Sequence, residues 1–380
     1  MSIIHSKSLL IVDDSAFMRK LLSDFFADHP YIRVVGTARN GMDAIKKIQM
    51  LKPDIVTMDI EMPLMNGLEA LKIIMKDHPL PVIMLSSATQ SGAKSTFEAM
   101  DAGAVDFIPK PSGAISLDLK DIKSDIIRIV ENAATVHVSK LTKKREPIDE
   151  KINISKNLLG DQKTVKPLND SNVKTQTITS STQKSWHTNA KKIVLIGTST
   201  GGPRALQEVI PYLPQDMKAP VIIVQHMPMG FTKSLANRLD QLSKIRVKEA
   251  EQGDILQNGV AYIAPGGYHL RLRKVAKTYA IELDNVEPPN GGHRPSVDIM
   301  FDSVSQFNDL DKIAVIMTGM GSDGTKGLQA LKRNGNVKAI AESANTSVVY
   351  GMPKAAYATG LVDEVADLHD ISKIIMKYLT

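Results

Sequence analysis

Short apolar runs rich in β-branched residues alternate with helical patterns in the first part of this chain. The runs are Ser8–Val12, Ile32–Gly36, Ile55–Met58, Pro81–Leu85 and Ala104–Ile108, and helical stretches begin near Ser15, Gly41, Gly67 and Gly92, with a fifth at Leu119–Val130. Strands that alternate with helices pair in parallel, because each helix carries the chain back along a face of the sheet. The alternation therefore predicts a five-stranded, doubly wound parallel sheet, whose ligands gather at the carboxyl ends of the strands.

The same alternation returns in the last part of the chain. Its apolar runs are Ile193–Ile196, Val221–Val224, Ile313–Met317 and Val337–Ala341. A β-rich insertion at about residues 246–284 contains the segments AYIAP, YHLRLRK and TYAIEL, which are typical of hairpins. We therefore predict a C-terminal α/β domain with a mainly parallel sheet and inserted β-hairpins.

The segment between the two patterns has a different composition. Residues 131–190 are rich in Lys, Thr, Ser, Asn and Gln, and they carry 10 basic and 6 acidic side chains. Such a segment buries too little apolar surface to offset its ordering entropy, so we predict a flexible linker between domains at 1–130 and 191–380. Most of the net charge of +6 lies in this segment and no nucleic-acid-binding motif is evident, so nucleic acid is not expected as a partner.

Features of the whole chain limit its location and its chemistry. The chain has no cysteine, which excludes disulfides, thiolate metal sites and a cysteine nucleophile. It contains no apolar run of about eighteen residues, so no membrane insertion is expected. The N-terminus reaches Asp13 and Asp14 too early for a secretory signal, and we expect a cytoplasmic protein.

Charged side chains follow several of the N-terminal strands. Asp13 and Asp14 end the first strand, Asp59 ends the third, and Lys110 follows the fifth. Carboxylates that share one sheet edge repel one another unless a cation joins them, and oxygen ligands favour Mg²⁺. A lysine nearby can hold the oxygens of a phosphoryl group. The arrangement indicates phosphoryl transfer onto a carboxylate.

The motifs VDDS, MDIEMPLMNG, SSAT and DFIPKP occur in order over residues 1 to about 128. This part of the chain resembles a response-regulator receiver domain. The resemblance implies that Asp59 accepts a phosphoryl group from a histidine kinase. It also implies that Asp13, Asp14 and Asp59 bind Mg²⁺ for this reaction.

The same resemblance implies that two residues at other strand ends sense the phosphate. Ser86 and Ser87 end the fourth strand, and the register of the motif assigns this role to Ser86. Lys110 is the second phosphate-sensing residue. Phe107, three residues before Lys110, is implied to be an aromatic switch.

A serine lies in a glycine-rich turn in the C-terminal part of the chain. The run Ile193–Ile196 stops at Gly197, and the residues from Gly197 to Gly201 match the G-x-S-x-G pattern with Ser199 at its centre. Pro203 suits the first position of a helix that follows. The pattern indicates a nucleophilic hydroxyl on a strand–turn–helix connection, although a glycine-rich turn with an incidental serine also fits it.

Two further residues are predicted at the same sheet edge. His226 follows the run Val221–Gln225, and Asp323 follows a later apolar run. Parallel strands would place His226 where it can take the proton of Ser199, and a carboxylate can then fix the tautomer of the imidazole. Backbone N–H groups of the loop before Asp323, including that of Met320, can stabilise an oxyanion.

Two other functions remain open from the residues alone. The segment GMGSDG matches the G-x-G-x-x-G pattern of a dinucleotide-binding oxidoreductase, and Glu342 follows where a ribose-binding acid could lie. This match comes late in the chain, however, and it leaves Ser199 and His226 without a role. The other function is a receptor-binding adaptor that phosphorylation switches and that has no catalytic activity.

The motifs IGTSTGGP, QHMPMGFTKSLANRLD, AYIAPGGYHL, HRPSVD and MTGMGSDGTKG lie within residues 191 to about 378. They resemble the catalytic domain of the chemotaxis protein-glutamate methylesterases, which cleave γ-glutamyl methyl esters on chemoreceptors and deamidate receptor glutamines. The receiver-like part, the linker and this part follow the layout of that family. The resemblance implies that Ser199 is the nucleophile, His226 the general base and Asp323 the orienting acid, with Thr200 and Met320 as adjacent supports.

The resemblance also implies partners and a location. The expected substrates are cytoplasmic domains of methylated chemoreceptors, the expected location is the cytoplasm at chemoreceptor arrays, and the receiver is expected to gate the esterase. The esterase is expected to need no cofactor and the protein to be a monomer.

Thr198 stands where the family often has alanine, which alters packing but not the assignment. His293 and Arg294 lie in a loop that either lines the substrate groove or is plain surface.

Overall fold

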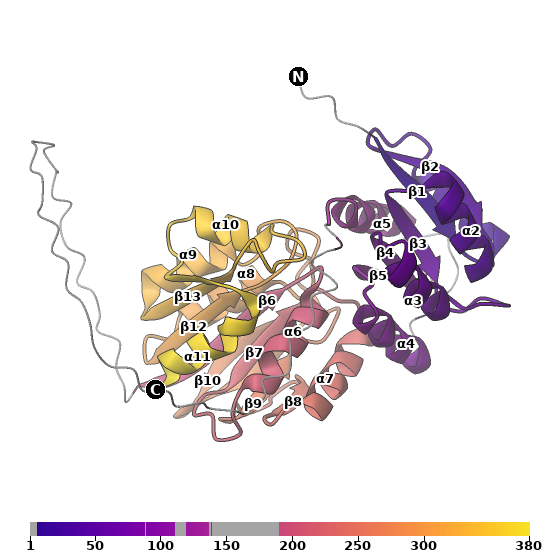
Figure 1. Ribbon diagram of the computed structural model, residues 1–380. Coiled ribbons are helices and arrows are strands. Elements are labelled where there is room, and N and C mark those ends of the chain that lie inside the picture. The colour runs from indigo at the N-terminus through magenta and orange to yellow at the C-terminus, as the bar shows by residue number, and fades with distance from the viewer. Residues whose placement is uncertain (1–5, 88, 111–118, 137, 139–189) are drawn as a thin grey trace, which may run out of the picture.

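The computed structural model describes residues 6–87, 89–110, 119–136, 138 and 190–380 (Figure 1). Almost all of the predicted linker lies outside these residues. The described residues form a parallel sheet in each part of the chain, and helices cover both faces of each sheet. The predicted fold class is thus confirmed.

The N-terminal domain contains a five-stranded parallel sheet with the strand order β2-β1-β3-β4-β5. Its elements are β1 (Lys7–Val12), α1 (Ala16–Phe25), β2 (Ile32–Ala38), α2 (Gly41–Leu51), β3 (Ile55–Asp59), α3 (Gly67–Asp77), β4 (Val82–Ser86), α4 (Gln90–Asp101), β5 (Asp106–Pro109) and α5 (Leu119–Ala133). Helices α2, α3 and α4 pack on one face of the sheet, and α1 and α5 pack on the other. Because β1 and β3 are neighbours, Asp13 and Asp59 come together at their carboxyl ends.

Polar residues define where the N-terminal helices begin. The side chains of Ser15, Asn40, Asn66 and Thr89 each accept a hydrogen bond from a backbone N–H in the first turn of α1, α2, α3 and α4. Such caps satisfy N–H groups that have no partner within the helix. At α3 the Glu69 side chain also accepts the N–H of Asn66, which completes a capping box.

The C-terminal domain contains a seven-stranded sheet with the order β14-β13-β12-β6-β7-β9-β8, in which every neighbouring pair is parallel. Its strands are β6 (Lys191–Thr198), β7 (Val221–Gln225), β8 (Arg246–Glu249), β9 (Val260–Ile263), β12 (Leu310–Ile316), β13 (Val337–Glu342) and β14 (Glu364–Ala366). Its helices are α6 (Gly202–Val209), α7 (Phe231–Leu242), α8 (Val297–Ser305), α9 (Thr325–Asn334), α10 (Met352–Ala358) and α11 (Ile371–Leu379). Helices α6, α7 and α11 cover one face, and α8, α9 and α10 cover the other.

The predicted hairpins are only partly correct. The strands β10 (His269–Val275) and β11 (Thr278–Asp284) form an antiparallel pair, as predicted. The AYIAP segment does not form a hairpin, because β9 pairs in parallel with both β7 and β8 at the edge of the main sheet. Helix α7 carries the chain from β7 to β8, so β9 can return between them in the same direction. The short strand β14 was not predicted.

The position of β6 decides where the candidate site lies. Strand β6 pairs with β12 on one side and with β7 on the other. The connection out of β6 runs toward β7, whereas β12 joins the sheet on the opposite side much later in the chain. At such a switch point the loops after neighbouring strands diverge and leave room for a ligand. The loops after β6, β7 and β12 contain Ser199, His226 and Asp323, respectively.

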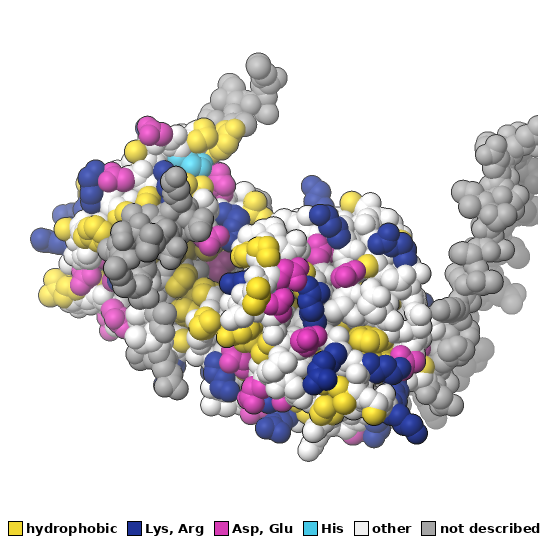
Figure 2. Space-filling model, turned by 180° about the vertical axis from the view of Figure 1, so that it is seen from behind, with side chains coloured by type: hydrophobic (Ala, Val, Ile, Leu, Met, Phe, Trp, Pro, Cys, Tyr) yellow, Lys and Arg dark blue, Asp and Glu magenta, His cyan; other side chains and the backbone are white. Residues whose placement is uncertain are grey.

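The surface agrees with the composition. On the face shown in Figure 2, basic and acidic side chains are interspersed over the C-terminal domain and form no continuous basic stripe. Among the described residues, no helix combines the length and the apolar character that crossing a membrane requires. The mixed distribution of basic and acidic side chains gives no support to a nucleic-acid interface on this face.

Phe301 tests the packing of α8 against the sheet. Its side chain is 0% exposed and lies in the apolar cluster between α8, α9 and the sheet. We expect Phe301→Ala to lower the free energy of unfolding of the C-terminal domain by about 3–5 kcal/mol, because a large cavity replaces the ring. Urea unfolding measures the change, and Phe301→Leu should cost clearly less. Equal stability of Phe301→Ala and the wild type would contradict this packing.

Candidate active site

The turn after β6 holds Ser199 in a buried position. The Ser199 N–H donates to the Thr318 carbonyl at 3.0 Å, and the Gly202 N–H donates to the Ser199 carbonyl at 2.7 Å. Gly201 has φ of +77°, a left-handed conformation that glycine adopts without strain. A Cβ atom on Gly202 would lie 1.9 Å from Gln225 Oε1, so this position also needs glycine. The strand, tight turn and helix predicted around Ser199 are therefore present.

Gln225 holds together the two loops that carry Ser199 and His226, a role that was not predicted from the sequence. Its Nε2 donates to the Ser199 carbonyl at 2.9 Å and to the His226 carbonyl at 3.2 Å. Its Oε1 accepts the hydroxyl proton of Thr198. Its side chain is 2% exposed. The one signal in the sequence is a polar residue that ends the apolar run VIIVQ.

His226 and Asp323 form a direct pair. His226 Nε2 lies 2.8 Å from Asp323 Oδ2. Asp323 also accepts the Ser296 hydroxyl at 2.8 Å and the N–H groups of Val297 at 2.7 Å and Asp298 at 2.9 Å. Burial acts to raise the pKa of Asp323, but the His226 contact and these N–H donors outweigh it and lower the pKa to about 2. Asp323 is therefore ionised at neutral pH.

This pairing determines which nitrogen of His226 can act as a base. An ionised Asp323 can only accept a hydrogen bond from Nε2–H, so the neutral ring carries its hydrogen on Nε2 and its lone pair on Nδ1. The Nδ1 atom is buried and has no hydrogen-bond partner among the described residues. His226 thus has a free acceptor nitrogen, and His226 and Ser199 line the same cavity, although the two side chains are not hydrogen-bonded.

The loop after β12 supports the turn that carries Ser199. Thr318 accepts the Ser199 N–H through its carbonyl, and its hydroxyl donates to the Thr200 carbonyl at 2.9 Å. The fully buried Glu342 accepts the Thr318 N–H at 2.7 Å. Glu342 therefore braces the loop from inside the protein rather than facing a ribose. Met320 lies on the same loop and is 38% exposed.

A cavity of about 450 Å³ lies between the two domains, over the edge that carries Ser199. The C-terminal domain lines it with Ser199, Thr200, His226, His293 and Arg294, and the N-terminal domain lines it with residues of β5 and α5 that include Asp106, Phe107, Lys110 and Arg128. His293 and Arg294 thus belong to the cavity rather than to plain surface. In this arrangement the N-terminal domain covers the candidate active site.

Several contacts between described residues join the two domains. The ring of Phe107 lies 4.6 Å from the ring of Phe231 at the start of α7. Asp101 on α4 forms an ion pair of 2.6 Å with Arg238 on α7. Burial raises the pKa of Asp106, while a hydrogen bond with the Thr200 side chain opposes this shift, so β5 also contacts the residue after the serine.

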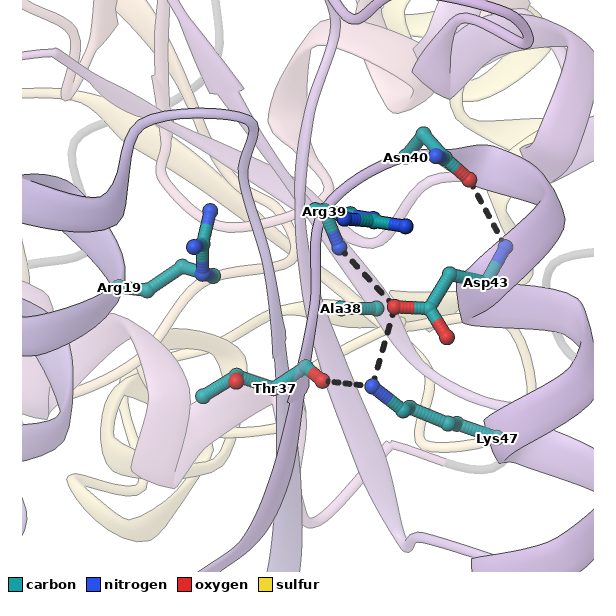
Figure 3. Close-up of a pocket in the computed structure, with 7 residues that line it drawn as sticks. All are labelled: Arg19, Thr37, Ala38, Arg39, Asn40, Asp43 and Lys47. Carbon is teal, nitrogen blue, oxygen red and sulfur yellow. Dashed lines mark hydrogen bonds and ion pairs between the residues drawn. The ribbon is translucent and has the colours of Figure 1, made fainter.

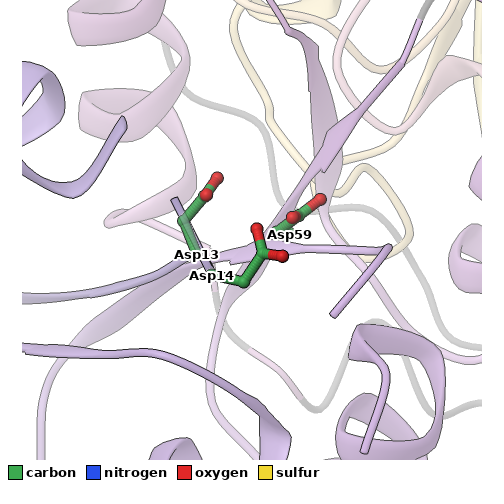
Figure 4. Close-up of side chains that lie close together, drawn as sticks. All are labelled: Asp13, Asp14 and Asp59. Atoms are coloured by element: carbon green, nitrogen blue, oxygen red, sulfur yellow. The ribbon is translucent and has the colours of Figure 1, made fainter. Parts of the chain in front are cut away.

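The acidic cluster predicted in the N-terminal domain is present. Asp13, Asp14 and Asp59 each offer a carboxylate oxygen within 4.8 Å of the others (Figure 4). Lys110 Nζ lies 2.6 Å from Asp59 and 3.5 Å from Asp13. Burial raises the pKa of Asp59 to about 6 even though Lys110 is adjacent. Asp13 Oδ2 is buried and accepts no hydrogen bond from the described residues. Such oxygen ligands, with charge only partly compensated, fit Mg²⁺.

Ser86 is not joined to this cluster in the structure. Its hydroxyl donates to the Gly92 carbonyl at 3.1 Å and accepts the hydroxyl proton of Thr96 at 2.7 Å, so it is bonded to α4. Its neighbour Ser87 is half-buried, and its hydroxyl lies 3.1 Å from that of Thr89. Ser87 is therefore the alternative hydroxyl at the end of β4.

A second hollow lies beside the acidic cluster, between α1, β2 and α2. Its volume is about 460 Å³, and Arg19, Arg39, Asp43 and Lys47 line it (Figure 3). Arg19 Nη1 donates to the carbonyls of Asp13 at 2.8 Å and Asp14 at 2.9 Å. Lys47 is bonded to Asp43 and to the Thr37 carbonyl. The hollow thus borders the backbone of the acidic pair and takes no part in the Ser199 site.

The fold and the two sites define a receiver domain that is joined to an α/β enzyme domain. Residues 9–120 match the response regulator receiver domain family, and residues 194–375 match the CheB methylesterase family. The chain is 50% identical to the protein-glutamate methylesterase/protein-glutamine glutaminase of Geobacillus kaustophilus over 98% of each chain. It is 48% identical to the protein of that name from Bacillus subtilis over 97% of each chain.

A crystal structure of the Thermotoga maritima CheB methylesterase catalytic domain is 45% identical in sequence, with a TM-score of 0.48, and the match covers 50% of this chain and 98% of that one. The identity of about one half to full-length relatives is decisive. This chain belongs to the family of protein-glutamate methylesterases/protein-glutamine glutaminases that carry a receiver domain.

Asp298 provides a test of the electrostatics around Asp323. Burial raises its pKa from 3.8 to about 6, and the charge of Asp323 acts in the same direction. A raised pKa means that the wild type loses stability as the pH rises from about 4 through about 6. Asp298→Asn removes this charge and keeps an oxygen that can accept the Gly327 N–H.

We therefore expect Asp298→Asn to be more stable than the wild type by about 1–2 kcal/mol at pH 7.5 and to have no advantage at pH 4. Urea unfolding at both pH values measures this difference. The matched control is Asp302→Asn, which changes an exposed carboxylate of the same helix. A stability difference that does not change with pH would contradict the account.

Proposed function

We propose that this protein hydrolyses γ-glutamyl methyl esters, and deamidates glutamines, on the cytoplasmic domains of chemoreceptors by a Ser-His-Asp mechanism. The pairing of His226 Nε2 with an ionised Asp323 is the observation that carries the proposal, since it leaves Nδ1 free to act as a base in a residue that lines the same cavity as Ser199. The identity to the methylesterase relatives supports the choice of substrate.

The reaction has two stages. His226 Nδ1 takes the proton of the Ser199 hydroxyl while Ser199 Oγ attacks the ester carbonyl, and Asp323 stabilises the resulting imidazolium. His226 then returns the proton to the leaving methoxide, so methanol departs and a glutamyl ester of Ser199 remains. Water attacks this ester with His226 again as the base, and free glutamate and Ser199 are restored.

Backbone donors stabilise the oxyanion in both stages. We assign this role to the loop of Met320, which Thr318 and Glu342 hold against the turn of Ser199. One donor of this kind contributes roughly 10²–10³ in rate. Thr200 supports the turn beside the nucleophile, and the esterase reaction needs no cofactor.

We further propose that Asp59 accepts a phosphoryl group from a histidine kinase and that this event opens the active site. Asp13, Asp14 and Asp59 would hold Mg²⁺, which when bound neutralises charge on the phosphoryl oxygens. The phosphoryl oxygens on Asp59 attract the Lys110 ammonium group and accept a hydrogen bond from a hydroxyl at the end of β4. The Phe107–Phe231 and Asp101–Arg238 contacts then weaken, and the population shifts toward an open form. The setting would be chemotactic adaptation by a monomer at cytoplasmic chemoreceptor arrays.

Ser199→Ala tests the proposed chemistry. We expect methanol release from methylated receptor to fall by at least about a thousandfold, because the methyl group of alanine cannot attack the ester carbonyl. Phosphorylation of the chain by a small phosphodonor with Mg²⁺ should be unchanged. Ser234→Ala, on α7, is the matched control and should keep full activity. Retained methanol release in Ser199→Ala would exclude this mechanism, and an adaptor without catalysis would show no release in the wild type.

Asp101→Asn tests the gating. It removes the ion pair with Arg238, which is partly exposed, so we expect about a two- to fivefold rise in methylesterase activity without a phosphodonor. Deleting residues 1–135 should raise this activity further. Asp77→Asn, at an exposed position on α3, is the control. With a phosphodonor, Asp101→Asn and the wild type should converge. An unchanged or lower basal rate in both the variant and the deletion would refute inhibition by the receiver.

A further inference from the structure

A second histidine ring lies flat against the proposed general base. The rings of His226 and His293 are stacked with centroids 3.8 Å apart and an interplanar angle of 7°. The stack covers a face of the His226 ring, while the Nε2 edge remains paired with Asp323. Nothing in the Ser199, His226 and Asp323 mechanism requires this ring.

The backbone around His293 is built to hold it there. Asn290 and His293 exchange two backbone hydrogen bonds of 3.0 Å each across Gly291 and Gly292. Both glycines have positive φ, +58° and +83°, as a tight two-residue turn requires. The position of His293 is thus set by a turn that favours glycine at both central positions.

The same turn is bonded to the orienting acid. The Asn290 side chain donates to the Ser296 hydroxyl at 2.9 Å, and that hydroxyl donates to Asp323 at 2.8 Å. Asp323 is thus connected to the turn through Ser296 and Asn290. The turn carries His293, whose ring stacks on His226, and His226 is in turn paired with Asp323. These contacts position the His293 ring relative to both His226 and Asp323.

The charge of His293 suits a contact with a base that becomes positive. Burial lowers the pKa of His293 to about 3, and the charges of His226 and Arg128 act in the same direction, while Asp323 opposes them. His293 is therefore neutral at the pH where the enzyme works. A neutral aromatic face attracts an adjacent cation, whereas a second imidazolium would repel it.

We propose that His293 is a positioning residue for the hydrolysis: its neutral ring fixes the plane of the His226 imidazole and stabilises the positive charge that His226 gains from Ser199. This inference rests on the proposed Ser-His-Asp function. It requires the flat aromatic face of His293 and does not require its ring nitrogens. That requirement separates it from a role in binding the substrate by hydrogen bonds.

The experiment compares three variants in the full-length chain. His293→Phe keeps a flat ring without nitrogens, His293→Asn keeps polar atoms without a ring, and His293→Ala keeps neither. Methanol release from methylated receptor membranes gives kcat and KM for each variant, and thermal unfolding verifies that each is folded. His369→Ala, an exposed histidine of the same domain, is the control.

We expect His293→Ala and His293→Asn to lower kcat about tenfold with KM within about twofold of the wild type, because the stabilised state is the charged one. His293→Phe should keep kcat within about threefold. The proposal is overturned if His293→Asn keeps the wild-type kcat and His293→Phe does not. It is also overturned if the variants change KM without lowering kcat, or if His293→Ala keeps the wild-type kcat. Activity in Ser199→Ala would instead refute the underlying mechanism, so the two failures are distinguishable.

Discussion

One buried carboxylate that stays ionised holds the candidate active site together. A carboxylate taken out of water becomes protonated unless donors replace the lost solvation. Asp323 receives these donors from the first turn of α8, from the Ser296 hydroxyl and from His226. A second contact joins the same two segments in the opposite direction: Asp298 on α8 accepts a hydrogen bond from the Gly327 N–H in the first turn of α9. The packing of α8 on α9 thus sets both the charge of Asp323 and the orientation of the imidazole.

The two sites of the molecule meet on a single strand. Within five residues, β5 and its end carry Asp106 against Thr200, Phe107 against Phe231, and Lys110 against Asp59. Packed interiors transmit small displacements because they contain few voids. A change in the ion pair between Lys110 and Asp59 can therefore displace Asp106 and Phe107, which contact the C-terminal domain a few residues away on the same strand. This arrangement supports the proposed gating.

Most of the fold and much of the candidate site could be predicted from the chain alone. The alternation of runs and helices gave both parallel sheets, and the position of Ser199, His226 and Asp323 at strand ends followed from it. The partial failures have physical causes. Strand β9 was taken for part of a hairpin because short β-type runs that follow one another closely usually pair antiparallel, whereas its partners β7 and β8 run parallel to it, and β14 has only three residues. The phosphate-sensing role of Ser86 stays a prediction, and its hydroxyl is bonded to α4 in the structure.

The sequence by itself determined the elements, their parallel pairing and the residue types that reach each sheet edge, because these depend on local periodicity and on glycine and polar residues at fixed positions. Only the tertiary structure decided which groups touch. Gln225 and Glu342 became braces, His293 came to lie on His226, and Arg238 met Asp101. These contacts join segments far apart in the chain, so they depend on how helices pack on sheets and on how the two domains meet, and no local pattern encodes that geometry.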